Sequence, residues 1–462
     1  MGDGELTILG GGPAGLALAF YAQRAGLPFA LYERAAEPGG LCRTFRWDGH
    51  AYDAGAHRFH DSDAGVTADV QTLLGDALAT VEAPSQILAG GRFIDFPPTP
   101  INWLLGQGVA EAGRVALDLW RARRHPRPER TFEDHALNRY GRRLGKPLLL
   151  DYSEKLWGLP AAQLAPEVAT RRLSGLSLGA LVVELLRPNR KRAHLDGSFL
   201  YPRDGYGAIA AAMTATLPPA RLHLRHEITG LVCVRRRVRA IVLADGTERA
   251  VAGRLVSTLP LSLLVRFLGN ALPPEVHRAT ARLRFRHVRI VYLRLGTSHV
   301  SRNATVYLPD PALCVSRVSE PKNRSAAMAP AGETGLVAEV PCSTGDPLHT
   351  LSDEALAARV VDELSASGLI RRDVVRGWRH HLLANAYPVY GLDWSATVEY
   401  VRAAVATIEN VGLLGRGGLF WYSHLHDQMR LAKDWVASAT AAQQVAAHAQ
   451  IGGDAVPAAV GS

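Results

Sequence analysis

The stretch "LTILGGGPAGLALAFYAQRAGLPFALYER" (residues 6–34) decides the fold of this chain. A short β-branched and apolar strand leads into a turn in which Gly10, Gly12 and Gly15 have the spacing G-x-G-x-x-G, and an apolar helix follows. A second strand, "FALYE", then ends in Glu33. Strand, glycine turn, helix, strand and acid in this order predict a unit that binds a dinucleotide, and a glycine-rich turn without a ligand is the alternative.

Each glycine has a mechanical role in such a unit. The first permits the tight turn, the second lets the backbone approach a pyrophosphate, and the third lets the helix pack on the strand. The N-terminus of the helix then presents free amide groups to the phosphates, and the carboxylate accepts hydrogen bonds from the adenosine ribose. The predicted cofactor contacts in this stretch are Gly10, Gly12, Pro13, Ala14, Gly15, Glu33 and Arg34.

Three later segments favour FAD over NAD as the dinucleotide. Residues 37–60 contain a second glycine pair followed by Arg43, a cation that suits a pyrophosphate. Residues 226–260 alternate apolar and polar side chains around an Asp-Gly turn, which predicts a β-meander that returns to the first sheet. Residues 410–420 predict a strand that runs into another glycine turn. Widely separated segments that return to one nucleotide-binding unit fit FAD better than NAD.

The composition is typical of a soluble globular protein, since 47% of the 462 residues are apolar and 21% are charged. This length allows two or three domains. We expect no signal peptide, and no apolar run approaches the roughly 20 residues that span a bilayer. The four cysteines are far apart and form no C-x-x-C pair. This argues against a disulfide framework and a structural zinc site, and it favours a reducing, cytoplasmic location.

The formal net charge is +9, and the densest basic run is "RARRHPRPER" (residues 121–130). A solvated loop between helices is one interpretation of this run, and a site for an anionic substrate or a membrane surface is another. No recognisable nucleic-acid-binding module accompanies the charge, so we expect no nucleic-acid partner.

Two helices begin with capping signals. Thr131 is followed by two acids in the next turn, and Ser352 precedes an amphipathic stretch that extends to residue 368. The tail after Ile451 is expected to fray.

Five segments, in chain order, resemble one group of flavoproteins. They are "GGLCRT…YDAGAHRFH" within residues 39–60, "YSEKLWG" (152–158), "FLYPRDGYGAI" (199–209), "VSRVSEPKN" (315–323) and "LLGRGGLFWY" (413–422). The chain resembles the UDP-galactopyranose mutase and protoporphyrinogen-oxidase-like flavoproteins of the amine-oxidase-type FAD superfamily. The resemblance covers most of the length and implies FAD as the cofactor.

The pattern and the resemblance predict an α/β fold, in which a Rossmann-like FAD-binding domain carries a helical insert and an antiparallel β-sheet domain. The FAD-binding domain is expected in three pieces, residues 1–90, 195–275 and 395–462. The helical substrate domain is expected over 91–194, and the antiparallel sheet, with a helix, over 276–394. We expect the substrate pocket where these parts meet over the flavin.

The resemblance also implies roles for individual residues. It places His57 and Phe59 beside the isoalloxazine ring, and Arg317 at a substrate diphosphate. The residues expected in catalysis are His57, Arg317, Tyr422 and His426. Those expected to bind substrate are Tyr152, Lys155, Trp157, Tyr206 and Arg289. Further cofactor contacts are expected at Gly40, Leu41, Arg43, Gly55, Ala56, His57, Arg58, Ile228, Gly415, Arg416 and Leu425.

Several of these residues also have plain structural interpretations. Trp157 is a candidate core residue, Arg317 a candidate ion-pair partner, and His426, like His424, a candidate for capping or packing. His57 and His60 are three residues apart, but no third ligand is visible, so we expect no metal.

The chain departs from the mutase at the groups that hold the diphosphate. A second arginine of the mutase is replaced by Leu176, no tyrosine occurs in residues 345–350, and His426 stands in place of an acid. Leucine cannot replace a bidentate arginine contact. Either another cation serves, the candidates being Arg284, Arg286 and Arg289, or the substrate is not a nucleotide sugar.

Two functions follow from the resemblance. One is a mutase-like isomerase, in which N5 of reduced flavin acts on a sugar or sugar nucleotide, with a substrate other than UDP-galactose itself. We favour this first function, because the specific motifs resemble those of the mutase group, and the alternative is an oxidoreductase that takes a hydride from a small biosynthetic intermediate. A non-enzymatic FAD-binding protein is a third and weaker alternative. The expected partners are an anionic or sugar-like small molecule and an external reductant or oxygen.

Overall fold

The computed structural model describes residues 4–96, 109–172 and 198–453. Its first sheet has five parallel strands in the order β19-β13-β1-β2-β9. The strands β1, β2 and β13 are buried apolar runs, as is usual in parallel sheets that are covered on both faces. The bounds are β1 Leu6–Leu9, β2 Phe29–Glu33, β9 Leu222–Leu224, β13 Leu255–Ser257 and β19 Val411–Leu413.

Helix α1 (Pro13–Arg24) connects β1 to β2 and is apolar on nearly all sides. Every residue from Ala14 to Ala22 is buried. This is because α1 packs against the parallel sheet and also contacts α9 (Gly207–Ala215) and the long C-terminal helix α16 (Leu425–Gly453). The predicted strand–turn–helix–strand unit is therefore present, and it lies deep in the molecule.

The second large sheet has seven strands in the order β18-β14-β17-β16-β15-β6-β7. Neighbouring strands within this sheet are antiparallel, except for β6 and β15, which are parallel to each other. The bounds are β6 Ser85–Ala89, β7 Arg92–Phe96, β14 Phe285–Leu295, β15 Thr305–Tyr307, β16 Arg317–Ser319, β17 Thr334–Cys342 and β18 Val375–Pro388.

Two strand segments lie elsewhere than the sequence suggests. Strand β6 falls within the stretch 1–90 assigned to the FAD-binding domain, but its backbone pairs with β15 and so belongs to the seven-stranded sheet. The predicted meander does not join the first sheet, since β10 (Ile228–Val234), β11 (Arg237–Leu243) and β12 (Glu248–Ala250) form a sheet of their own. The strand that returns to the first sheet is β13, which follows them.

Two further pairs of strands complete the β structure of the described residues. They are β3 (Thr44–Trp47) with β4 (His50–Asp53), and β5 (Leu78–Glu82) with β8 (Ser198–Pro202).

The helical segment comprises α4 (Val109–Arg124), α5 (Phe132–Gly145), α6 (Asp151–Trp157) and α7 (Glu167–Arg172). The predicted start at Thr131 is confirmed, because its hydroxyl accepts the Asp134 N–H while the Asp134 carboxylate accepts the Thr131 N–H. A π-helical turn at residues 146–150 joins α5 to α6.

Ser352 is likewise confirmed as an N-cap, since its hydroxyl accepts the Ala355 N–H at the start of α13. The remaining helices are α2 Ala64–Leu74, α10 Leu261–Leu268, α11 Pro274–Thr280, α12 Pro347–Thr350, α13 Asp353–Ala366, α14 Trp394–Val405 and α15 Gly415–Gly418. Within the described part of the chain, every helix is too short or too polar to cross a membrane. Most of the tail predicted to fray, residues 454–462, lies outside the described residues.

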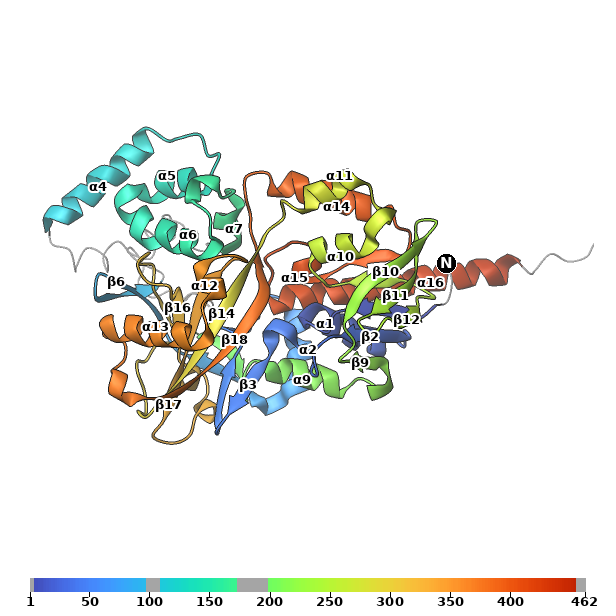
Figure 1. Cartoon of the computed structure of the whole chain (residues 1–462), viewed down its shortest axis with the longest axis horizontal. Helices are drawn as coiled ribbons and strands as arrows, with labels where there is room; N and C mark the ends of the chain where they lie inside the picture. The colour runs from blue at the N-terminus through green and yellow to red at the C-terminus, as the bar shows by residue number, and fades with distance from the viewer. Residues whose placement is uncertain (1–3, 97–108, 173–197, 454–462) are drawn as a thin grey trace, which may run out of the picture.

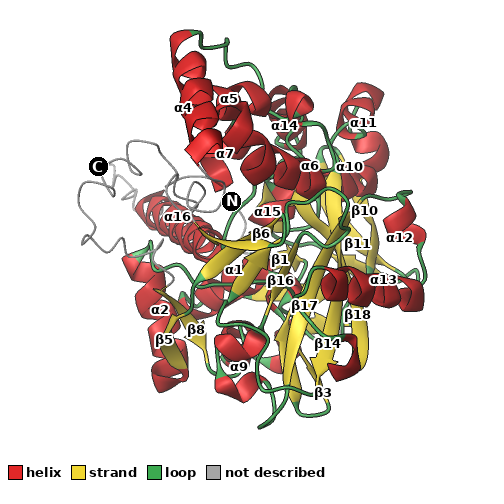
Figure 2. Ribbon diagram, turned by 90° about the vertical axis from the view of Figure 1, so that its left-hand side faces the viewer, coloured by secondary structure: helices red, strands yellow, loops and turns green. Residues whose placement is uncertain are grey.

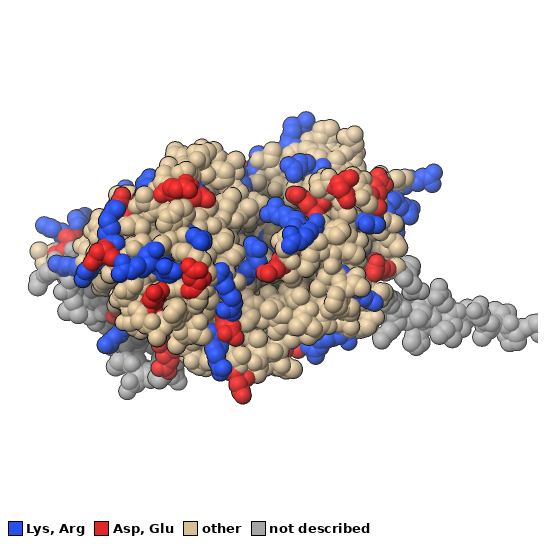
Figure 3. Space-filling model, turned by 60° about the horizontal axis from the view of Figure 1, so that its bottom comes forward, with Lys and Arg blue, Asp and Glu red and all other residues tan. Residues whose placement is uncertain are grey.

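The two large sheets lie side by side, and the helical segment covers one end of the seven-stranded sheet (Figure 1). The same arrangement seen from the side places α4 and α5 at the outer edge of the molecule, with α16 close to α1 (Figure 2). On the face in Figure 3, acidic side chains are interspersed with basic ones, so the positive net charge does not form one continuous field there.

Candidate active site

A cavity of about 1220 Å³ lies where the parallel sheet, the seven-stranded sheet and the helical segment meet. Its lining comes from chain segments as far apart as Gly10 and Gln428. One end is formed by the glycine motif and the edges of the parallel sheet. The other is formed by α5, the turn before α6, and strands of the large sheet.

The glycine motif forms the first end as the sequence predicts. Gly10 has φ +95°, a conformation that side chains disfavour. A Cβ on Gly15 would lie 1.9 Å from the Gly10 carbonyl oxygen, so this position requires glycine for the helix to pack on the strand. A Cβ on Gly12 would meet nothing within 4 Å, because Gly12 faces the open cavity.

The N-terminus of α1 has the features of an anion site. Gly12 is the N-cap, Pro13 follows at the first helical position, and no side chain among the described residues caps the helix. Glu33 ends β2 beside it, where its two carboxylate oxygens accept the Gly11 N–H at 2.7 Å and the Ala35 N–H at 2.8 Å. Each oxygen keeps a further lone pair for a ribose hydroxyl.

The C-terminal glycine turn returns to the same place. Gly415 has φ +80°, and a Cβ there would lie 2.7 Å from Ala14 Cβ, so glycine lets α15 approach the start of α1. Arg416 is fixed by hydrogen bonds to the backbone oxygens of Ser423 and Ala386. A glycine turn, free helix amides, an acceptor carboxylate and a cation along one groove are the groups that FAD requires. The residues present therefore fit FAD.

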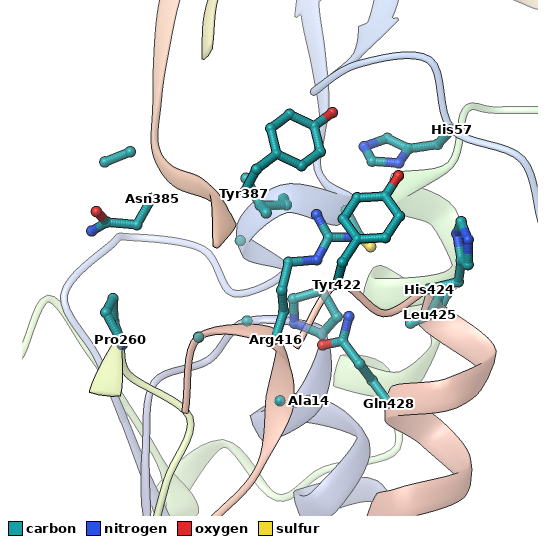
Figure 4. A pocket seen from close by; sticks show the side chains of 18 of the residues that line it. Ala14, His57, Pro260, Asn385, Tyr387, Arg416, Tyr422, His424, Leu425 and Gln428 are labelled. Atoms are coloured by element: carbon teal, nitrogen blue, oxygen red, sulfur yellow. The ribbon is translucent and has the colours of Figure 1, made fainter. Parts of the chain in front are cut away.

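At the middle of the cavity, aromatic rings surround Arg416. Figure 4 shows Tyr387, Tyr422 and His57 around its guanidinium group, whose carbon lies 5.0 Å from the Tyr422 ring centroid and 5.8 Å from that of Tyr387. The His57 ring stacks on Tyr206 at 4.9 Å. Burial lowers the pKa of His57, so its imidazole is neutral.

Arg317 enters this region from β16. Its guanidinium forms an ion pair of 2.8 Å with Glu339, the residue directly opposite on β17, and donates to the Tyr387 hydroxyl at 3.2 Å. The other Glu339 oxygen accepts the Ala56 N–H at 2.9 Å. Burial is the largest single effect and opposes the charge of Arg317, but the Glu339 carboxylate together with three nearby tyrosines outweighs it and raises the pKa of Arg317. These tyrosines are Tyr387, Tyr152 and Tyr307. Glu339 thus links the large sheet to the loop that carries His57.

Three further histidines line the cavity together. The His60 ring lies 4.9 Å from His424 and 6.0 Å from His426, and the His424 and His426 rings are stacked at 5.7 Å. Burial, with the neighbouring His60 and Arg416, lowers the pKa of His424 to about 3. The described residues contain no group of three or more His, Cys, Asp or Glu side chains that could hold a metal ion.

The second end of the cavity is apolar and aromatic. The Tyr307 ring lies 4.9 Å from Phe96 and 5.5 Å from Tyr152. Arg58 is a charged residue of this end: its guanidinium donates to the Ser85 hydroxyl at 2.5 Å, and burial lowers its pKa. The apolar lining residues of this end are Ile87, Phe96, Phe132, Leu148, Leu149, Val168 and Pro309.

With this geometry established, the chain can be compared with known proteins. It matches the family described as flavin containing amine oxidoreductase over residues 13–398, which is most of its length. The chain belongs to this family. It is therefore an FAD-dependent enzyme, in agreement with the glycine motif and the groove around it. No curated protein sequence matches the chain significantly.

Solved structures share the fold of this amine oxidoreductase family member at low sequence identity. A reduced UDP-galactopyranose mutase is 18% identical, with a TM-score of 0.81 and 94% of each chain covered. A candidate protoporphyrinogen oxidase from Exiguobacterium sp. 255-15 is 20% identical, with a TM-score of 0.73 and coverage of 95% of this chain and 99% of the other. A putrescine oxidase bound to putrescine is 16% identical, with a TM-score of 0.67 and the same coverage. These likenesses establish the fold.

Most of the predicted site residues of this family member line the cavity. The predicted cofactor contacts in the lining are Gly10, Gly12, Pro13, Ala14, Glu33, Arg34, Gly40, Leu41, Ala56, His57, Arg58, Ile228, Gly415, Arg416 and Leu425. The other predicted site residues there are Tyr152, Tyr206, Arg317, Tyr422 and His426. Among the remaining cofactor predictions, Gly15 and Gly55 lie behind the lining, and Arg43 donates to the Gly40 carbonyl beside the Phe45 ring.

Three residues expected to bind substrate lie outside the lining. The Lys155 ammonium donates to the backbone oxygens of Leu308 (2.7 Å), Val315 (3.2 Å) and Asp310, and burial lowers its pKa to about 8. Trp157 is fully buried behind Tyr387 and Tyr422, 6.1 Å from each ring. Arg289 is buried in the large sheet, where its partners are Asp353, His380 and the Leu348 and Leu351 carbonyls.

The other cations considered as diphosphate ligands do not reach the cavity either. Arg286 pairs with Asp346 at 2.9 Å and donates to the Ser343 hydroxyl. Arg284 is exposed at the start of β14 and is absent from the lining. Leu176, which stands where the mutase has an arginine, lies outside the described residues.

The sequence did not reveal several residues of the site. Glu339, Tyr387 and Arg266 sit in ordinary strand or helix patterns, and no local motif marks them. Glu339 could have been found only from the register that places it opposite Arg317. Arg266 lines the cavity from α10, next to Leu263 and Phe267.

Proposed function

We propose that the protein is an FAD-dependent oxidoreductase that takes a hydride from a small molecule with an apolar body. The observation that carries this proposal is the lining of the second cavity end, where apolar and aromatic side chains predominate. Burial of apolar surface contributes about 25 cal/mol per Å², so such a lining favours a hydrocarbon or aromatic substrate over a strongly hydrated one.

The charges near this end support the same choice. Among the described residues, the cations that line it are Arg58 and Arg317, and the charge of Arg317 is already balanced by Glu339. A diphosphate carries at least about two negative charges and binds best to several unpaired arginines or lysines. Lys155, Arg286 and Arg289 are each committed to other partners.

Bound FAD supplies a two-electron acceptor for the hydride. The apolar lining holds the substrate and excludes water from the reacting carbon. If the substrate carries an N–H or O–H at that carbon, oxidation also releases a proton. The neutral imidazole of His57 faces the cavity and is the candidate acceptor, whereas His424, with its pKa lowered to about 3, holds a proton too weakly for this role.

We also propose that the protein works in a reducing compartment such as the cytoplasm, with oxygen or another acceptor reoxidising the flavin. All four cysteines are free, and three of them are buried. This fits an environment in which disulfides do not form.

An anaerobic mixing experiment tests the proposal. Oxidised holoenzyme is mixed with a panel of candidate substrates while the visible absorbance of the flavin is followed. The oxidoreductase proposal expects one class of apolar substrates to bleach the flavin without added reductant. Turnover that requires prior reduction by dithionite, with no net consumption of electrons, would contradict it.

The same experiment addresses the second candidate, a mutase-like isomerase acting on a sugar or sugar nucleotide. One observation favours that candidate, namely that residues of three mutase-like segments line the same cavity. His57 and Tyr422 lie around Arg416 (Figure 4), and Arg317 donates to the neighbouring Tyr387. Redox-neutral turnover of a sugar nucleotide by the reduced enzyme would support this second candidate.

A pair of variants tests the role of the apolar end once a substrate is found. Leu149→Gln places a polar group in the cavity lining, and Leu392→Gln makes the same change at an exposed leucine outside it. The proposal expects Leu149→Gln to raise KM by about tenfold, which corresponds to roughly 1.4 kcal/mol of lost apolar contact, while Leu392→Gln leaves KM unchanged.

A further inference from the structure

The outer face of helix α4 combines exposed apolar side chains with arginines. Leu117 is 44% exposed and Trp120 is 54% exposed, although both are large apolar residues. Residues three, four and seven apart share a helix face, so Arg121 and Arg124 lie on the same side as Leu117 and Trp120. The Arg124 guanidinium carbon lies 5.6 Å from the Trp120 ring centroid.

More arginines follow at the end of the helix and in the loop after it. Arg123, Arg127 and Arg130 are exposed in and after the last turn of α4. The one exposed acid in this run, Glu129, pairs with His135 at 3.0 Å. The basic run therefore keeps an excess of positive charge beside the two apolar side chains.

The opposite side of α4 is anchored to the protein. The Asp118 carboxylate accepts the Arg143 N–H of α5 at 2.8 Å, and Glu111 forms ion pairs with Arg143 at 2.7 Å and Arg114 at 3.2 Å. Val115 is buried on the same side. Figures 1 and 2 both place α4 at the outer edge of the molecule beside α5, so its other face is directed away from the body of the protein.

From this arrangement we propose that α4 docks the protein on the surface of an anionic lipid bilayer. Arginines attract acidic headgroups, tryptophan favours the interface, and leucine inserts among the acyl chains. A nucleic acid would satisfy the arginines but would give no role to an exposed leucine. A bilayer accounts for both kinds of side chain at once.

Docking in this way also places the helical segment, which lines the apolar end of the cavity, next to the membrane. Phe132 at the start of α5 and Leu149 in the turn before α6 line the apolar end of the cavity. The proposal does not depend on the reaction, and it holds for either candidate function.

Flotation of the full-length holoenzyme with lipid vesicles tests the proposal. We expect the protein to float with phosphatidylcholine vesicles that contain phosphatidylglycerol, to float much less with phosphatidylcholine alone, and to be released by high salt. Absence of flotation with the anionic vesicles would overturn the proposal.

Two pairs of variants distinguish vesicle binding through α4 from nonspecific binding caused by net charge or by exposed apolar side chains elsewhere. The double variant Leu117→Ser with Trp120→Ser should lower the bound-to-free ratio by at least about tenfold. Its control, Leu392→Ser with Tyr400→Ser, changes side chains that are 56% and 46% exposed elsewhere and should bind normally. Equal loss in both variants would overturn the proposal.

The second pair removes the same net charge at two places. Arg121→Gln with Arg124→Gln should weaken binding, whereas Arg235→Gln with Arg239→Gln, at exposed positions of the β10–β11 hairpin, should not. FAD content and melting temperature report whether each variant is folded. Binding to heparin or DNA that matches vesicle binding and is insensitive to the Leu117 and Trp120 changes would also overturn the proposal.

Discussion

Gly12 and Gly15 are three residues apart, but glycine is needed at the two positions for different reasons. Gly15 lacks room for a Cβ because of the Gly10 carbonyl, whereas Gly12 faces open cavity. We predict that Gly15→Ala destabilises the fold by about 1–3 kcal/mol or more through overpacking. Gly12→Ala should leave the FAD-free protein as stable as the wild type but weaken its affinity for FAD. Chemical unfolding and FAD titration of both variants check this, and equal loss of stability would contradict it.

His424 predicts a pH dependence of stability. Its pKa is lowered to about 3 in the fold, so the unfolded chain binds the proton more readily between about pH 3 and 6.5. The free energy of unfolding therefore falls as the pH drops through this range. In His424→Gln, the difference between about pH 7 and pH 5 should shrink by up to about 2 kcal/mol.

Urea unfolding at the two pH values measures this difference. His125→Gln, a change at an exposed histidine, is the matched control and should behave as the wild type. An unchanged pH dependence in His424→Gln would show that this histidine does not titrate as its buried position requires.

At the scale of residues, the sequence predicts those features of the site that depend on local backbone geometry. The glycine spacing and the acid at the end of β2 follow from steric rules within about 30 residues, and the structure has both as expected. The predicted Arg317 lies in the cavity lining, but its partner Glu339 was missed because strand register sets that contact. The resemblance predicts that Lys155 binds substrate, but in the structure its ammonium donates to three backbone carbonyls. These carbonyls are about 150 residues away in the sequence, so the residues around Lys155 do not reveal them.

At the scale of elements, Lys155 connects α6 to the segment between β15 and β16. Two of its carbonyl partners, Leu308 and Asp310, flank Pro309, which lines the cavity, and the third is Val315. Hydrogen bonds to a charged group each contribute about 1.5–3 kcal/mol. Lys155→Met should therefore lower the free energy of unfolding by about 2–5 kcal/mol. A change in the free energy of unfolding below about 0.5 kcal/mol would contradict a structural role for these three hydrogen bonds.

Lys146→Met is the control for this variant. Lys146 is also a lysine of the helical segment, but its side chain is half exposed where it pairs with Asp151. Exposed pairs contribute about 0–1 kcal/mol, so its loss should be small. Comparing the denaturant midpoints of the two variants distinguishes the loss of the Lys155 hydrogen bonds from a general effect of removing a positive charge.

Element-scale expectations succeeded where helices carry their own end signals. The hydroxyls of Thr131 and Ser352 cap α5 and α13 as predicted, because capping depends on residues within one turn. The sheet assignment of β6 could not be derived in the same way. Its partner β15 is more than about 200 residues away, and nothing in a short strand states which sheet it joins.

At the scale of the whole molecule, the groove that fits FAD is built from segments at both ends of the chain. The groove includes Gly12 near the N-terminus, Ile228 in the middle and Arg416 near the C-terminus. A ligand that binds the folded state alone stabilises it, by about 2.7 kcal/mol at a free concentration one hundred times Kd. Removing FAD should therefore lower the melting temperature, and adding it back should restore the value. No change on FAD removal would contradict a groove shared by all three segments.

The arrangement of the parts explains why the substrate is harder to predict than the cofactor. FAD binding depends on backbone turns that a local motif encodes. The second cavity end is assembled from α5, the turn before α6 and two strands of the large sheet, with side chains as far apart as Ile87 and Arg317. Its apolar character appears only when these segments are brought together.

We infer that this cavity holds FAD along the groove from the α1 glycine turn to Arg416. The most direct measurement is the flavin content of the purified full-length protein, from its visible spectrum and from the FAD released on denaturation. We predict a yellow protein with about one FAD per chain, or one that reaches this ratio when FAD is added. A colourless protein that takes up no FAD on reconstitution would contradict the account.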